Sequence, residues 1–588
     1  MELLINSLLS VDRISLLFTL LLLLWSIMLT VLHHIWRKKA AKNSPEEPAL
    51  RQCMFIWRLL CLVPLPLAAL HSIFFHFRGS WEINLALYGS LYFVSILLAL
   101  WQFLAHRKYG YRVAAACVNL CAILGLLMFF SVHSALYTKV HNFTNQSYTE
   151  SFRSILRTMQ REYVLSEWKD IDYDVLEKDI MPMVEEAEET QDSIAYGIAL
   201  MNYTYRFYDG HVCVDALDDE VTDALCERLA GNDYGFSLAT LDDGSTIAVL
   251  TDPDSAAYEL GIRDGSIITR WDGSSIADAV QDVSCIYPEI LTFPVAENES
   301  YIKPLFLAGK GGKEIEITFL DENGNEKTAS LKSMGSYQAR LELALSRFYH
   351  SDIEDENFSC KMLTDACGYL RINAENCGFP YDTMASLQGE YHQITEILDK
   401  KLQTLCDNGM KTLIIDLRGN EGGSDFMSPS IASLFSKEEF FCHTFARYKD
   451  GVYIPLKTEV KVAANGAYAD IPTAVLVNAQ CCSSGDGLAE NLSRLPNITL
   501  MGITSSNGIC QTTGGYCFTT DSEYAIAYPY LLDLDENGEP RIDTRADRIN
   551  RIPLKRHIPL TKESALAIFS GEGDYELEYA MDFLKQDR

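Results

Sequence analysis

The sequence lacks the patterns that mark several common kinds of site. It has no H-E-x-x-H motif and no paired C-x-x-C spacing, so no zinc site is indicated. Basic residues are scarce, because 49 Lys and Arg stand against 80 Asp and Glu, a net charge of −31. This balance excludes a nucleic-acid-binding surface that neutralises phosphates. We therefore expect no metal, no cofactor and no nucleic-acid partner.

The chain also contains two regions that differ in charge and hydropathy. A chain of 588 residues predicts three or four domains, and its mean hydropathy is zero. Residues 1–140 carry 12 Lys and Arg against 5 Asp and Glu, whereas residues 141–588 carry 37 against 75. The sequence predicts an apolar, slightly basic region followed by an acidic globular region.

The first region holds four apolar stretches that are long enough to cross a bilayer as helices. They are approximately Ile14–Leu32, Leu59–Phe75, Ile83–Leu104 and Val113–Tyr137. Lys and Arg follow the first and third stretches, so the positive-inside rule places the residues after Tyr137 outside. Residues 1–140 are thus predicted to be a four-helix transmembrane anchor with the lipid bilayer as partner. The expected location is the cell membrane, multi-pass, with the large domain on the extracellular side.

Cysteine usage fits an oxidising compartment without fixing a pattern. Twelve of the 16 cysteines follow residue 140, and an even number permits disulfides. Their spacing determines no connectivity.

The acidic region divides into three predicted parts. Residues 141–215 show helical periodicity that ends at Asp209-Gly210-His211. Residues 216–335 change to short alternating strands, and residues 336–588 alternate strands with helices, which is typical of an α/β core.

The middle part, residues 216–335, opens on Tyr234-Gly235-Phe236-Ser237. The order and spacing of its glycines and strands resemble a PDZ domain, in which a loop and the adjacent strand bind a peptide C-terminus. These four residues are the predicted peptide-binding segment. A generic small β-domain is the alternative.

Two segments of the α/β part could carry chemistry. Leu413–Leu417 reads as a buried strand that leads into Arg418-Gly419-Asn420-Glu421-Gly422-Gly423, a glycine-rich turn without a nucleotide-binding pattern. Val477–Ala489 runs from a strand through Ser483-Ser484-Gly485-Asp486 into a helix. A serine at a helix N-terminus either caps the helix or reacts where free N–H groups favour an oxyanion.

Together these segments resemble the C-terminal-processing (tail-specific) serine peptidases, with a tricorn-core-like branch and a crotonase/ClpP-like α/β core. The resemblance covers about residues 148–565. It implies a serine endopeptidase with Ser483 as nucleophile. It also implies an oxyanion hole formed by the N–H of Ser484 and of Gly422 or Gly423, with Asp486 steadying the serine helix.

The resemblance departs from the tail-specific pattern at the base. No Lys occurs in residues 501–509, where those members carry one. The tricorn-like branch uses a His at the position of His211, which the resemblance therefore implies as the base. The acid is expected near the C-terminus, where Asp547 or Asp543 stands close to the family's Glu position.

Three readings follow for the whole chain. The first is a membrane-anchored serine endopeptidase that cleaves peptides or proteins and recognises their C-termini through the PDZ-like domain. The second is an inactive homologue that binds a peptide or ligand. The third is a signalling receptor, which the short loops of the first region disfavour. The sequence leaves substrate identity and oligomeric state open.

Overall fold

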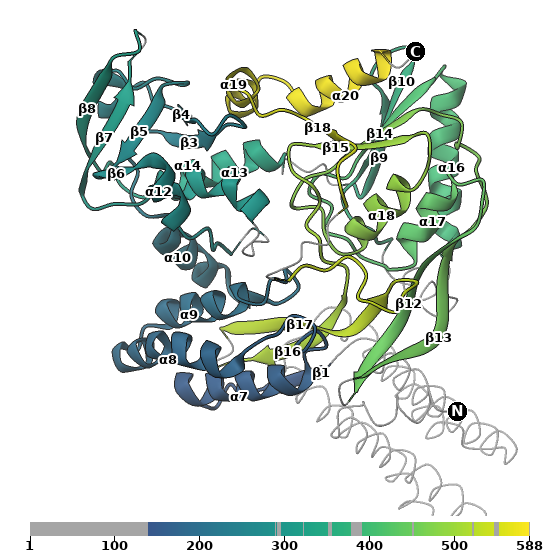
Figure 1. Cartoon of the computed structure of the whole chain (residues 1–588), viewed down its shortest axis with the longest axis horizontal. Coiled ribbons are helices and arrows are strands. Elements are labelled where there is room, and N and C mark those ends of the chain that lie inside the picture. Colours follow the sequence, from purple (N-terminus) through teal and green to yellow (C-terminus); the bar gives the residue numbers. More distant parts are fainter. Residues whose placement is uncertain are drawn as a thin grey trace, which may run out of the picture. The chain divides into compact units, whose positions relative to one another are not determined.

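The computed structural model describes residues 139–288, 290, 296–321, 323–350, 356–377, 391–449, 452–519, 523–545 and 552–586. The chain divides into two compact units, Met1–Asn142 and Phe143–Arg588. In the first unit, the residues that the structure describes are those of strand β1 (Lys139–Asn142). The elements below belong to the second unit and are labelled as in Figure 1.

A mostly parallel sheet forms the centre of the α/β part. Its strand order is β18-β15-β14-β11-β10-β9, and only the edge strand β9 runs antiparallel to its neighbour. The strands are β9 (Phe358–Met362), β10 (Cys367–Ile372), β11 (Thr412–Asp416), β14 (Thr473–Leu476), β15 (Ile498–Gly502) and β18 (Arg556–His557). The sequence predicts strands at Cys367–Ile372, Thr412–Leu417 and Thr473–Asn478, and these agree with β10, β11 and β14 to within two residues.

Helices pack against both faces of this sheet. They are α16 (His392–Asp407), α17 (Met427–Ser433), α18 (Ser484–Ser493), α19 (Lys562–Ser570) and α20 (Tyr575–Gln586). Along β11, Leu413 and Ile415 lie in the core shared with α16–α18, whereas Ile414 lies in the core shared with α19 and α20. A strand buried on both faces needs a continuous apolar run, which is why β11 is readable from the sequence. The α/β part of the predicted fold class therefore agrees with the structure.

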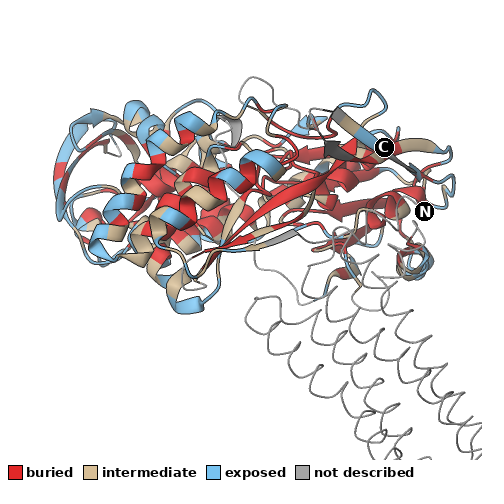
Figure 2. Ribbon diagram, turned by 90° about the horizontal axis from the view of Figure 1, so that it is seen from below, coloured by how far each residue is buried: buried red, intermediate tan, exposed pale blue. Residues whose placement is uncertain are grey.

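An antiparallel sheet joins this core to the predicted helical region. It contains β2 (Cys213–Ala216), β12 (Phe440–Lys449), β13 (Val452–Val462), β16 (Thr512–Phe518) and β17 (Tyr524–Leu534). Helices α7 (Tyr148–Glu162), α8 (Tyr173–Thr190) and α9 (Ser193–Tyr205) share a core with the fully buried β17. Figure 2 shows this burial, with exposed residues on the outer faces of helices.

The start of each of these helices is fixed by a capping side chain. Ser147, Asp172 and Asp192 each accept a hydrogen bond from the first turn of the helix that follows. Such residues satisfy N–H groups that a helix leaves unpaired. The third helix ends just before the Asp209-Gly210-His211 loop, as the sequence predicts.

A separate antiparallel sheet fills residues 237–332. Its strands follow the order β3-β4-β5-β7-β8, and β6 pairs with β5. They are β3 (Ser237–Thr240), β4 (Thr246–Val249), β5 (Ile267–Trp271), β6 (Ser274–Ser275), β7 (Glu314–Leu320) and β8 (Glu326–Lys332). The helices around it are α10 (Asp219–Ala230), α11 (Ala256–Glu259), α12 (Ile276–Asp282), α13 (Ala296–Leu307) and α14 (Gln338–Tyr349).

The predicted four-helix transmembrane anchor is contradicted. In the part of the chain that the structure describes, no helix is both long and apolar enough to cross a membrane. The longest described helix, α8, has 18 residues but carries acidic side chains along its length. The four apolar stretches themselves lie outside the described residues. We withdraw the anchor and the multi-pass location in the cell membrane with an extracellular domain.

No disulfide joins the twelve cysteines of the described ranges. The pairing that the even count permitted is therefore not seen there.

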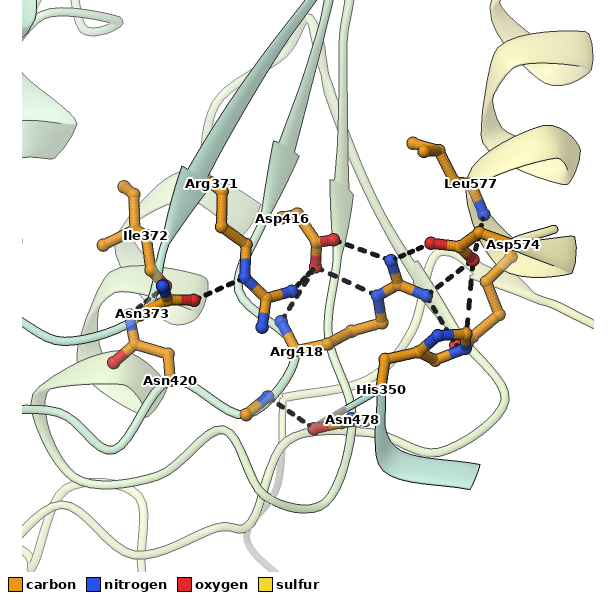
Figure 3. A network of polar contacts seen from close by, with 12 residues as sticks. His350, Arg371, Ile372, Asn373, Asp416, Arg418, Asn420, Asn478, Asp574 and Leu577 are labelled. Carbon is orange, nitrogen blue, oxygen red and sulfur yellow. Dashed lines mark hydrogen bonds and ion pairs between the residues drawn. The ribbon is translucent and has the colours of Figure 1, made fainter. Parts of the chain in front are cut away.

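A buried ion network fixes the end of β11 to helix α20 (Figure 3). Arg418, fully buried, donates to the carboxylates of Asp416, Asp574 and Glu576 at 2.6–3.1 Å. Asp416 also pairs with Arg371 of β10 at 2.9 Å. Because an uncompensated buried charge is costly, these groups hold the residues just before the glycine-rich turn in one arrangement.

Candidate active site

The turn that follows β11 is folded around the buried side chain of Asn420. Its Nδ2 donates to the Ile372 carbonyl (3.1 Å), and its Oδ1 accepts from the Gly422 N–H (2.7 Å). The Asn420 carbonyl accepts from the Cys482 N–H (2.9 Å). Asn420 therefore binds the glycine-rich turn both to β10 and to the residue before Ser483.

Gly422 lies directly against the backbone of the two serines. Its φ is +82°, and a Cβ atom added there would lie 2.6 Å from Ser483 Cβ and 2.9 Å from Ser484 N. Only glycine combines this conformation with so close an approach.

Ser483 occupies a strained turn between β14 and α18. Its φ and ψ are 57° and −127°, and it makes no side-chain capping bond although it directly precedes the helix. Such a conformation costs about 1–3 kcal/mol in a residue other than glycine. Its Oγ has no hydrogen-bond partner among the described residues. The capping interpretation therefore does not apply, and a strained strand-to-helix turn that presents a serine is typical of a nucleophile.

Asp486 steadies Ser483 through the loop after β15. Its carboxylate accepts from the N–H groups of Gly508 (3.0 and 3.1 Å) and Ile509 (3.1 Å). The Ile509 carbonyl in turn accepts from the Ser483 N–H (2.9 Å). Asp486 thus fixes the backbone of Ser483 from the first turn of α18.

Two backbone N–H groups beside Ser483 are unused. Within the described ranges the N–H groups of Ser484 and Gly423 donate no hydrogen bond, whereas Gly422 donates to Asn420. Oriented N–H groups without a partner are what an oxyanion hole requires. Of the two glycines that the sequence analysis names, Gly423 keeps a free donor and Gly422 supplies the close approach.

His211 lies in the buried loop between α9 and β2. Its Nδ1 has no hydrogen-bond partner among the residues that the structure describes and lies 4.0 Å from Asp209 Oδ1, which accepts the His211 N–H at 2.9 Å. Burial lowers the pKa of this imidazole from its ordinary 6.5, Asp209 opposes that shift, and Lys169 adds to it. The ring is therefore neutral at pH 7 and able to accept a proton.

The loop that carries His211 contacts the loop that carries Ser483. The Tyr208 side chain packs against Cys482 and Ile509. Cys482 directly precedes Ser483, and Tyr208 stands three residues before His211. No hydrogen bond joins Ser483 to His211 among the residues described. The two loops are therefore in contact, and within the described residues the side chains of Ser483 and His211 form no hydrogen bond.

Comparison with protein families decides the class of this arrangement. Residues 366–545 match the model of Peptidase family S41, and this range contains the glycine-rich turn and Ser483. The chain contains a peptidase family S41 domain. It is a serine-type peptidase. His211 lies before the matched range.

Solved structures similar to this S41 peptidase include other proteases. Mature CPAF complexed with lactacystin is 14% identical, with a TM-score of 0.48, and the match covers 75% of this chain and 98% of that one. The photosystem II D1 C-terminal processing protease is 15% identical (TM-score 0.30, 73% and 98% covered). The tricorn protease is 15% identical (TM-score 0.30, 75% and 37% covered). A search of curated proteins gives no match. The family assignment rests on the match of residues 366–545 to the family model, and these structural similarities add no argument to it.

An ion cluster beside His211 contains Asp543, which the sequence indicates, and Lys169 and Tyr163, which it does not. Lys169 Nζ forms an ion pair with Asp543 and lies 3.6 Å from Asp209 Oδ2, which also accepts from Tyr163 Oη at 2.6 Å. All four side chains are fully buried. Burial raises the pKa of Asp543 to about 8; Lys169 opposes this shift, and Asp209 adds to it. Nothing in the local pattern separates Lys169 from a solvated surface lysine.

The predicted acids have different outcomes. Asp547 lies outside the described residues, and Asp543 belongs to the cluster just described. The carboxylate for which a contact with the imidazole is seen is Asp209, which stands in the same loop as His211.

The predicted peptide-binding segment is buried and partly occupied by internal contacts. Tyr234 Oη donates to the Gly312 carbonyl (2.6 Å), and the Gly235 N–H donates to Asp233 Oδ1 (2.8 Å). Ser237 Oγ shares a 2.6 Å hydrogen bond with Tyr337 Oη. The fourth residue, Phe236, packs its ring edge-on against Trp271.

Proposed function

We propose that this S41 peptidase is an endopeptidase in which Ser483 attacks the scissile carbonyl and His211 is the general base. The observation that carries the proposal is the conformation of Ser483. Its backbone is strained, its side chain does not cap α18, and among the described residues the nearby N–H groups of Ser484 and Gly423 donate no hydrogen bond. The active site of a serine hydrolase needs a nucleophile, a base and hydrogen-bond donors to the oxyanion of the tetrahedral intermediate.

The reaction follows from these groups. Ser483 Oγ would bond to the substrate carbonyl carbon while its proton passes to His211 Nε2, and the N–H groups of Ser484 and Gly423 would hold the oxyanion. The C–N bond then breaks, the amine leaves with that proton, and water hydrolyses the acyl-enzyme. Asp209 would orient the imidazole at Nδ1, while Asp547 stays a prediction.

We further propose that residues 216–335 bind a substrate C-terminus at Tyr234–Ser237. Strand β3 lies at the edge of its sheet, and among described residues the Phe236 N–H has no partner. An extended peptide can add to such an edge while an N–H accepts its carboxylate. Matched peptides with a free or an amidated C-terminus test this, because only recognition of the carboxylate lowers KM for the free acid.

The catalytic proposal is tested with a serine-reactive fluorophosphonate and a peptide library. We expect the wild type to be labelled and to cleave, Ser483→Ala to lose both, and His211→Ala to lose most of both. A folded wild type that takes no label would support the alternative of an inactive, peptide-binding homologue. Equal turnover by all three proteins would refute the assignment.

A further inference from the structure

Glu375 connects both sides of the proposed oxyanion hole through its main chain. Its N–H donates to the Gly422 carbonyl (2.7 Å), and its carbonyl accepts from the Ser424 N–H (2.8 Å). These bonds flank Gly423, where an added Cβ atom would lie 2.2 Å from the Glu375 carbonyl oxygen. The backbone of Glu375 therefore fixes the peptide unit that contains one of the two free donors.

The side chain of Glu375 reaches the residue that carries the other donor. Ser484 Oγ lies 2.5 Å from Glu375 Oε2 and 3.0 Å from the Ser424 carbonyl. A hydroxyl has one proton to donate and can accept a second. Because the Ser424 carbonyl can only accept, both contacts are satisfied when Ser484 donates to that carbonyl and Glu375 donates to Ser484. This pattern requires the carboxyl to be protonated.

The surroundings of Glu375 favour the neutral form. The residue is fully buried, and its Oε1 has no hydrogen-bond partner within the described part of the chain. Burial raises the pKa of Glu375 to about 8; Ser484 lowers it, Asp425 raises it and Arg541 lowers it. The other titratable groups that interact with it are the buried thiols of Cys481 and Cys482. The hydrogen-bond geometry and the raised pKa therefore both favour a protonated Glu375 carboxyl.

We propose that Glu375 is a positioning residue that, as a neutral acid, holds the Ser484 and Gly423 N–H groups at the spacing that binds the oxyanion. The inference rests on the proposed function of Ser483. Loss of the proton would leave Ser484 Oγ between two acceptors and place a negative charge beside a developing one. Either effect raises the barrier of the step that forms the tetrahedral intermediate.

The test compares kcat and KM of the whole chain against pH for four proteins: wild type, Glu375→Gln, Glu375→Ala and Glu421→Gln. The exposed Glu421 lies in the turn after β11, whereas the buried Glu375 follows β10, and Glu421 serves as a control for loss of a carboxylate nearby. Gln keeps a donor toward Ser484 but cannot ionise. We expect kcat of the wild type to fall as pH rises through about 8, and kcat of Glu375→Gln to stay level to about pH 9.5.

The two Glu375 variants should differ at pH 7. Glu375→Gln should keep kcat within about threefold, whereas Glu375→Ala should lose about 100-fold with KM little changed, as for loss of an oxyanion donor. Glu421→Gln should follow the wild type at every pH.

The outcomes separate this inference from the proposed function. If the wild type cleaves and Ser483→Ala does not, but Glu375→Gln keeps the alkaline fall or loses as much kcat as Glu375→Ala, the role of Glu375 is refuted. If the wild type shows no Ser483-dependent labelling or cleavage, the proposed function fails. Thermal unfolding of each variant identifies any loss of kcat that comes from misfolding, and labelling of the folded fraction by fluorophosphonate against pH then gives the same comparison.

Discussion

The two sides of the candidate site are held by different forces. Ser483 and the glycine-rich turn are fixed mainly by hydrogen bonds to backbone groups, which come from the side chains of Asn420 and Asp486 and from the main chain of Glu375. The His211 loop is fixed by buried side-chain charges, with Lys169 between two carboxylates. Backbone bonds depend little on pH, whereas a buried charge cluster depends on every partner keeping its protonation state. The base side should therefore be the easier one to disable from a distance, whereas the nucleophile side should respond to pH through the carboxyl of Glu375.

The largest expected effect on the base side is removal of the imidazole. His211→Ala should lower kcat/KM by about 10²–10⁴, the usual contribution of a general base. His557→Ala, which removes an exposed His bonded to Asp242, is the control and should retain activity.

The pH dependence of the same step has a definite sign. The pKa of His211 is lowered from 6.5 by burial, so the neutral base persists below that pH, and activity should fall only as pH drops further. A wild-type acid limb centred above 6.5 would count against His211, and kcat/KM profiles measure it.

On the nucleophile side the strongest test is Gly422→Ala. The new methyl would collide with Ser483 and Ser484, so we expect kcat to fall about 10²–10³-fold through a displaced oxyanion donor. Gly244 has the same φ of +82° with nothing within 4 Å, and Gly244→Ala controls for the backbone strain alone. Similar kinetics for the two variants would show that the close approach does not matter.

Lys169→Met should break the base side, because it removes the cation of the cluster and its hydrogen bond to the Tyr208 carbonyl (2.8 Å). It leaves Asp209 and Asp543 buried without their cation, which should cost about 3–5 kcal/mol of unfolding free energy and lower activity in the folded fraction. Lys437→Met removes an exposed ion pair and should change stability by less than about 1 kcal/mol. Urea unfolding followed by a labelling assay measures both effects.

Tyr163→Phe is the mildest of these changes. Loss of its hydrogen bond to Asp209 should cost about 1–3 kcal/mol and shift the acid limb of the pH profile slightly. Tyr468→Phe, which removes a similar bond to Asp399 away from the site, should lose comparable stability and leave the pH profile unmoved.

The same contrast explains what the sequence could and could not predict. Strands β10, β11 and β14 and the turn with Gly422 and Gly423 are local patterns, so the sequence places them well. Ser483 is singled out by its strand-to-helix context together with the family resemblance, and its role stays a prediction. Lys169 and Asp543 are far apart in the chain, and their pairing exists only after folding. The membrane prediction relied on the length of apolar stretches and on the charges beside them, whereas no described helix is long and apolar enough to cross a membrane.

The Arg418 network also bears on how the peptidase is made. Arg418 is synthesised long before Asp574 and Glu576, two of the carboxylates that it binds in the folded chain. Until those residues are made, burial of Arg418 would leave part of its charge uncompensated. We expect the catalytic turn to stay unformed until translation has passed residue 576, which would protect the ribosome-bound chain and its neighbours from premature cleavage. A chain ended at Gly573 should therefore resist fluorophosphonate labelling, and labelling of that chain at the full-length rate would exclude this timing.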